Sequence, residues 1–172
     1  QMLFELKSIQ LKNVFLVYHD IKNNYKIEMY SEQMKAGMRQ KGALSDIKVR
    51  GDVLSYSIGI EENQYFKNKK LDVDAELTWD NTSKLLSIQK GDLVIDAGQF
   101  AIGGNIVISD KTIYDLTFEG VNTSISSISS LLPDSYAAYL KSYRSRGRVY
   151  FNGLLKGESS ALVNPLVELN FG

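Results

Sequence analysis

The feature that most constrains this chain is a strict alternation of apolar and polar residues. Between Leu71 and Trp79, every odd position is apolar and every even position is polar. Successive side chains of a β-strand point to opposite faces, so this stretch predicts a strand with one apolar and one polar face. Similar stretches recur along most of the chain. The pattern therefore predicts a mainly β protein built on a curved antiparallel sheet, groove-like or sandwich-like.

One region, near residues 123–145, departs from this alternation. Ile125, Ile128 and Leu131 recur at helical spacing, and Asn122 or Thr123 is placed to cap the first turn. We expect a short helical insertion there, after which the strand pattern returns.

Two stretches near the N-terminus break the regular pattern. The phase of the alternation slips by one residue around Lys7 and Ser8. A slip of one residue exchanges the two faces of a strand, so we predict a bulge or a sharp bend at that point. Residues 13–18 are apolar on both faces, which predicts a strand that is covered on both sides.

The segment from Ser31 to Lys41 is ambiguous. Met34 and Met38 stand four residues apart, as on one face of a helix, but Gly37 and Gly42 disfavour a helix.

Length and composition bound the class of protein. At 172 residues the chain suits one domain, so we predict a single β-rich domain over residues 1–172. Apolar residues make up 44% and charged residues 23% of the chain, which is typical of a folded protein. The net charge is zero, which argues against nucleic-acid binding. Without cysteine the chain has no disulfide, zinc–thiolate site or cysteine nucleophile.

No apolar run reaches the roughly 20 residues that span a bilayer, and no signal peptide is present. Gln1 precedes Met2, and residues 169–172 stop within a strand pattern. We interpret the chain as an excised segment of a longer protein.

Reactive residues form no catalytic motif. His19 is the single histidine and has no nucleophile motif around it. Asp72, Asp74 and Glu76 suggest calcium, but they alternate along one strand, whereas a calcium loop needs ligands converging from a curved backbone. We interpret them as a solvated strand face, and we predict no enzyme, no metal site and no cofactor.

One cluster of basic residues stands out near the end of the expected helices. Such a cluster either complements the helix dipole in a solvated turn or contacts anionic lipid head groups. The candidates for head-group contact are Lys141, Arg144, Arg146 and Arg148.

The C-terminal third carries a more specific pattern. A short helical element ends in Leu131-Leu132-Pro133, and a strand follows with the sequence Gly147-Arg148-Val149-Tyr150-Phe151-Asn152-Gly153. This resembles the C-terminal region of the AsmA-like family of Gram-negative envelope proteins, in which a Leu-Leu-Pro element precedes a Gly-x-Val-x-Phe-x-Gly strand. The stretch from Leu11 to Asp20 is similar to a strand and turn that precede this region in the family.

The resemblance implies a non-enzymatic periplasmic module in outer-membrane biogenesis. Members of the family are anchored in the inner membrane, so the anchor of this protein would lie N-terminal to the present segment. Related proteins build a curved sheet whose apolar concave side conducts lipids, so the implied partner is a phospholipid or another envelope lipid.

A curved sheet with one apolar face must cover that face with protein or with a ligand. If the helical insertion covers only part of it, the remainder is a groove for acyl chains. The same positions would also form the core of a closed protein. The candidate groove residues are Leu71, Val73, Ala75, Leu77, Trp79, Leu93, Ile95, Leu116 and Phe118.

Two other functions fit the residues. One is an extracellular β-sandwich module, an adhesin or a glycan binder, which would use exposed aromatic residues among the ten tyrosines. The other is a carbohydrate-active enzyme, which would need a pair of convergent carboxylates that the spacing does not single out.

Overall fold

A computed structural model describes residues 3–21, 24–60, 62–95, 98–109, 111–131, 133–134, 147–159 and 163–172. Strands dominate it, and the first three are unusually long. The elements are β1 (Leu3–Asp20), β2 (Tyr25–Lys41), β3 (Leu44–Ile60), β4 (Asn63–Tyr65), β5 (Lys69–Asp80), β6 (Leu85–Ile95), β7 (Gly98–Ile108), β8 (Thr112–Thr123), α1 (Ile125–Ser129), β9 (Val149–Ser159) and β10 (Leu166–Phe171).

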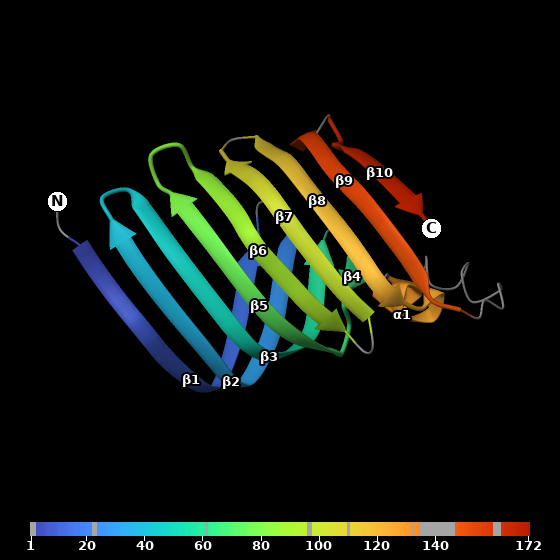
Figure 1. Cartoon of the computed structure of the whole chain (residues 1–172), viewed down its shortest axis with the longest axis horizontal. Coiled ribbons are helices and arrows are strands. Elements are labelled where there is room, and N and C mark those ends of the chain that lie inside the picture. Colours follow the sequence, from blue (N-terminus) through green and yellow to red (C-terminus); the bar gives the residue numbers. More distant parts are fainter. Residues whose placement is uncertain are drawn as a thin grey trace.

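The strands form one antiparallel sheet. Its order is β1-β2-β3-β5-β6-β7-β8-β9-β10, and the short β4 pairs with the end of β3. Nearly every strand therefore lies beside its neighbour in sequence, and Figure 1 shows them as one layer with the two termini at opposite edges. The predicted fold class, a curved, mainly β, antiparallel sheet with little helix, is confirmed. The order does not close, so β1 and β10 are both edge strands.

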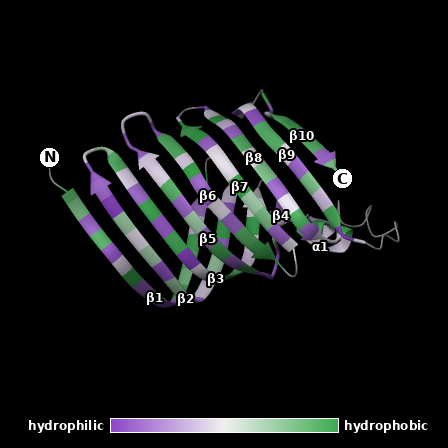
Figure 2. Cartoon of the chain, viewed as in Figure 1, coloured by the Kyte–Doolittle hydropathy of each residue, from purple (hydrophilic) through white to green (hydrophobic). Residues whose placement is uncertain are grey.

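The alternation of apolar and polar residues gives the sheet two chemically distinct faces. In Figure 2, hydrophobic and hydrophilic bands alternate along the strands from β5 to β9. Directly opposed residues of antiparallel strands point to the same face, so the register decides whether these bands match between strands.

The predicted irregularity at Lys7 and Ser8 is confirmed as a bulge. Before it, Leu6 pairs with Met38, and after it, Ile9 pairs with Ala36, so β1 has one extra residue. This residue restores the phase and keeps Leu6 and Ile9 on the same face of the sheet.

The first three strands also bend near their middles. Asn13 adopts a left-handed conformation with φ of 53°, and its side-chain oxygen accepts a hydrogen bond from Tyr30 Oη at 2.9 Å. The β2–β3 register shifts between Tyr30 and Met34, at the same level of the sheet. In Figure 1, the remaining halves of β1 to β3 pass behind the main layer.

The expectation that residues 13–18 are covered on both sides is wrong. This stretch lies in the edge strand β1, and Val14 to Tyr18 are each 36% exposed or more. An edge strand has a neighbour on only one side, which the residue pattern alone could not reveal.

A small core lies where the bent strands meet the main layer. Its buried apolar residues are Val53, Leu71, Ile95 and Leu131, and Met29 and Met34 pack against them. Leu131 follows α1, and its carbonyl accepts a hydrogen bond from Phe66 N at 3.1 Å. The segment after β8 therefore closes one end of the sheet.

The helical insertion is confirmed only over its first part. Helix α1 spans Ile125–Ser129, and residues 132 and 135–146 of the expected insertion lie outside the described residues. The cap is Ser124, not Asn122 or Thr123: its Oγ accepts a hydrogen bond from Ser127 N at 3.0 Å. Thr123 is still the last residue of β8.

Candidate functional site

The nine predicted groove residues all lie on one face of the sheet, which we call the inner face. In β5, residues 71, 73, 75, 77 and 79 share this face because strand side chains alternate. Leu71 is opposed by Ile95 and Val73 by Leu93 in β6. Leu116 and Phe118 reach the same face through the registers of β7 and β8.

The inner face carries an apolar row that crosses the whole sheet. Cross-strand pairs connect it without interruption from β1 to β10, with Gly104 as the one position without a side chain. The row consists of Leu6, Met38, Ile47, Leu77, Ile88, Gly104, Leu116, Leu155 and Val167. Nine strands at about 4.8 Å spacing give it a length of roughly 38 Å.

A second feature of the inner face is a group of four phenylalanine rings. Phe151 lies 6.2 Å from Phe100, 6.4 Å from Phe118 and 6.1 Å from Phe171, measured between ring centroids. These separations are typical of interacting aromatic rings. Only Phe118 was among the predicted site residues, because the other three come together only through the pairing of β7 to β10.

Glycines make room for these rings. Gly120 stands opposite both Phe100 and Phe151, and a Cβ atom on it would lie 2.1 Å from the Phe151 ring. Gly153 stands opposite Phe118, and a Cβ atom there would lie 2.6 Å from the Phe118 ring. The rings therefore lie over the bare backbone of the neighbouring strand, in the arrangement called aromatic rescue.

Within the described residues, the inner face is covered at one end and exposed at the other. Leu71 and Ile95 are 8% and 1% exposed and belong to the core, so the core interpretation holds for these two. The other seven predicted groove residues are only partly buried. On β10, Val167 is 56% exposed and Phe171 is 65% exposed.

Tyr114 is a further residue of the inner face, and it has a shifted pKa. Partial burial raises the pKa of the Tyr114 phenol above its ordinary value, and the phenol of Tyr25 raises that pKa further. Tyr114 is an inner-face residue of β8, since it is opposed by Ile106 and lies two residues from Leu116.

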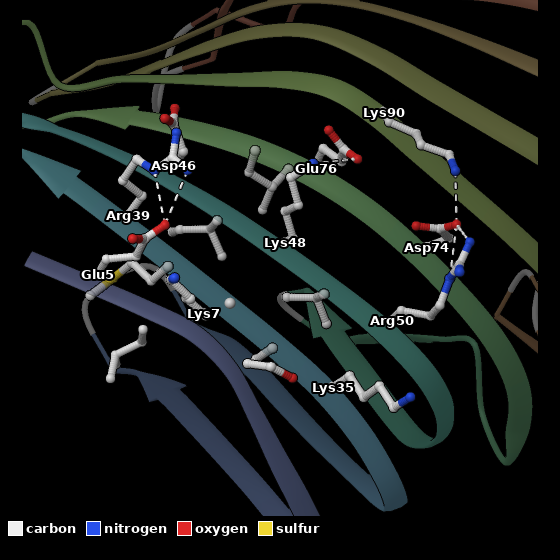
Figure 3. Close-up of a pocket in the computed structure, with 18 of the residues that line it drawn as sticks. Glu5, Lys7, Lys35, Arg39, Asp46, Lys48, Arg50, Asp74, Glu76 and Lys90 are labelled. Atoms are coloured by element: carbon white, nitrogen blue, oxygen red, sulfur yellow. Dashed lines mark hydrogen bonds and ion pairs between the residues drawn. The ribbon is translucent and has the colours of Figure 1, made fainter.

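The opposite side of the sheet, which we call the outer face, carries charged side chains that form ion pairs with one another. Arg50 and Lys90 both contact Asp74 Oδ2, Lys90 at 2.8 Å, and Lys48 Nζ lies 2.9 Å from Glu76 Oε1 (Figure 3). The hydrogen bond from Lys90, followed by that from Arg50, holds the pKa of Asp74 below its ordinary value. A hollow of about 710 Å³ lies over this part of the sheet.

The remaining predicted residues do not assemble into a reaction centre. Asp72, Asp74 and Glu76 follow the outer face of β5, and no group of three or more histidine or acidic residues in the described ranges could hold a metal ion. His19 lies in β1 beside a polar hollow of about 170 Å³. Arg148 is exposed just before β9, whereas Lys141, Arg144 and Arg146 lie outside the described residues.

Comparison with known proteins identifies no relative. No family model matches the chain, and neither a curated protein nor a solved structure matches it. None of the helices in the described ranges combines the length and the hydrophobicity that crossing a bilayer requires. Function must therefore be argued from the two faces of the sheet.

Proposed function

We propose that this chain is a non-enzymatic module that holds the acyl chains of lipids on its inner face. The observation that carries the proposal is the apolar row from Leu6 to Val167, which is continuous across the sheet and only partly buried. A folded protein normally covers such a surface with its own chain or uses it for binding. Here, among the residues that the structure describes, the core covers one end of the inner face and the other end is exposed.

The energetics favour an apolar and flexible ligand. Each methylene group that moves from water to an apolar surface contributes about 0.8 kcal/mol, so an acyl chain gains affinity along its length. The row offers such contacts across nine strands, and it presents no charged side chain to the ligand. A surface of this form favours ligands with long apolar chains and does not discriminate between head groups.

The resemblance to the AsmA-like family supplies the setting of the proposal. In that setting the module works in the periplasm in outer-membrane biogenesis, within a longer protein anchored in the inner membrane, and its ligand is a phospholipid or another envelope lipid. The open, curved sheet supports this proposal because it has the form that the family's lipid path requires. Arg148 and its basic neighbours in sequence are the proposed head-group contacts.

Native mass spectrometry of protein purified without detergent tests the proposal. The wild type should carry lipid, or take up a phospholipid after delipidation. Leu116→Glu puts a charge into the apolar row and should weaken phospholipid binding at least about tenfold. The neighbouring Thr117→Glu is the matched control, because it puts the same charge on the outer face of β8 and should leave binding unchanged.

Two outcomes would contradict the proposal. One is a delipidated wild type that rebinds no phospholipid. The other is an equal effect of both glutamate substitutions, which would place the bound lipid away from the inner face.

A further inference from the structure

Strand β2 has a glycine at the centre of a group of basic residues on the outer face. Gly37 precedes Met38, which belongs to the inner-face row, so position 37 belongs to the outer face. Strand β2 pairs with β1 on one side and with β3 on the other, so Gly37 lies within the sheet and not at its edge. Gly37 is one of the residues that line the outer-face hollow of about 710 Å³.

The nearest basic residues approach Gly37 from three strands. Along β2, Lys35 and Arg39 lie two residues before and after it, at about 7 Å between Cα atoms. Lys48 of β3 is directly opposed to Gly37, at about 5 Å. Lys7 lies in the bulge of β1, and its carbonyl oxygen would be 3.0 Å from a Cβ atom placed on Gly37. Figure 3 shows these basic side chains around the hollow.

The charges around the hollow do not balance. Among the described residues, six basic and four acidic side chains line it, which is an excess of two positive charges. Four of the six basic side chains form ion pairs with these carboxylates. The other two, Lys7 and Lys35, form no ion pair with a described residue, and Figure 3 draws no dashed line to either. The hollow therefore has a net positive charge and two ammonium groups without an acidic partner in the described part of the chain.

One cross-strand pair in this group is unfavourable for the protein alone. Lys35 and Arg50 stand directly opposite each other in β2 and β3, and on the other side Lys35 is opposed by Gln10 of β1. Like charges in directly opposed positions destabilise an antiparallel sheet. Asp74 neutralises Arg50, but no carboxylate stands opposite Lys35. A bound anion would reduce this repulsion.

We propose that the hollow binds a phosphate monoester group, held over Gly37 by Lys7, Lys35 and the adjacent basic residues. A phosphate monoester carries nearly two negative charges at neutral pH, which matches the excess of two positive charges. The glycine leaves the space that a side chain would otherwise fill. Hydrogen-bond donors also remain, because a guanidinium group has five and Arg39 uses only Nε and Nη2 in its contact with Glu5. This inference concerns the outer face and goes beyond the lipid binding proposed for the inner face.

An NMR titration with inorganic phosphate tests the site directly. At about pH 7.5, phosphate should shift the backbone amide signals of Gly37 and Lys48 in a saturable way. We expect a Kd on the order of 1 mM, because ion pairs of exposed side chains are individually weak. Sodium chloride at the same ionic strength should give no saturable shift of these two signals.

Two substitutions of Lys35 separate binding from folding. Lys35→Gln should weaken phosphate binding about threefold or more, because it removes one of the two unpaired positive charges. Lys35→Glu should weaken it at least about tenfold without lowering the melting temperature, because it places a carboxylate opposite Arg50. The matched control is Lys156→Gln, which removes an exposed lysine from the outer face of β9 and should leave phosphate binding unchanged.

Vesicles distinguish the two sources of such a phosphate group. If phosphatidylcholine vesicles that contain phosphatidic acid bind the wild type but not Lys35→Glu, the site accepts a lipid phosphate. If only inorganic phosphate shifts the Gly37 signal, the site takes a soluble phosphate. Three results would overturn the proposal: no saturable shift of Gly37, an equal response to sodium chloride, or equal weakening by Lys35→Gln and Lys156→Gln.

Discussion

The two ends of the inner face are built from the same kind of residues but differ in what covers them. Near the bend, Leu71 and Ile95 are covered by Leu131 and by the methionines of β2. Over β8 to β10, other residues of the inner face have no such cover from the described part of the chain, and Leu169 is 48% exposed. The comparison teaches that apolar alternation alone does not make a core. The covering segment decides which part of the face stabilises the fold and which part can bind a ligand.

The largest expected difference between the two ends is in stability. Ile95→Ala removes a fully buried side chain and should lower the free energy of unfolding by about 2–5 kcal/mol. Leu169→Ala removes an exposed inner-face side chain of β10 and should cost less than about 1 kcal/mol. Urea denaturation followed by circular dichroism measures both changes. Equal losses for the two variants would remove the distinction between a closed and an open end.

Two buried hydroxyl groups near the closed end sharpen the comparison. Ser55 and Thr123 are both 0% exposed, but Ser55 Oγ has no hydrogen-bond partner among the described residues, whereas Thr123 Oγ1 donates to the carbonyl of Val149 at 3.0 Å. Ser55→Ala should therefore leave stability unchanged or raise it by up to about 1 kcal/mol. Thr123→Val should lower it by about 1 kcal/mol, because it removes the hydrogen bond to the Val149 carbonyl. Thermal unfolding of both variants tests whether their effects have the predicted order.

On the outer face we expect a smaller change in stability, and its cause is electrostatic. The lowered pKa of Asp74 means that its ionised form is favoured in the folded state, mainly through Lys90 and Arg50. This contribution is fully present above the ordinary carboxyl pKa of 3.8 and is lost as the pH falls through the lower folded value. Wild type should thus be slightly more stable than Asp74→Asn at neutral pH, and the difference should shrink below about pH 4. High salt should also reduce this difference in stability, because the side chains of Arg50 and Lys90 are exposed to solvent.

The sequence predicts the sheet well wherever the alternation is unambiguous. Residues 71–79 and the slip at Lys7 and Ser8 both appear in the structure as predicted. The segment from Ser31 to Lys41 was ambiguous because Met34 and Met38 lie on one face in either structure. A spacing of four residues is close to one helical turn and is also two strand repeats. Here both methionines belong to β2.

Features that depend on strand order and register could not be predicted from the residues. The exposure of Val14 to Tyr18 follows from the position of β1 at an edge, which local sequence does not encode. The Phe151 ring packs over Gly120, which is 31 positions away in sequence but opposite Phe151 in the sheet. Such pairs become visible only when the pairing of β8 with β9 is known.

The central claim is that acyl chains lie on the inner face, and Trp79 offers the most direct test. It is the single tryptophan of the chain, and it stands on the inner face opposite Leu86. Phospholipids with brominated acyl chains quench tryptophan fluorescence on contact, so they should quench Trp79 in the delipidated protein, and an unbrominated phospholipid should compete. Undiminished Trp79 fluorescence in protein that mass spectrometry shows to be loaded with brominated lipid would contradict the account.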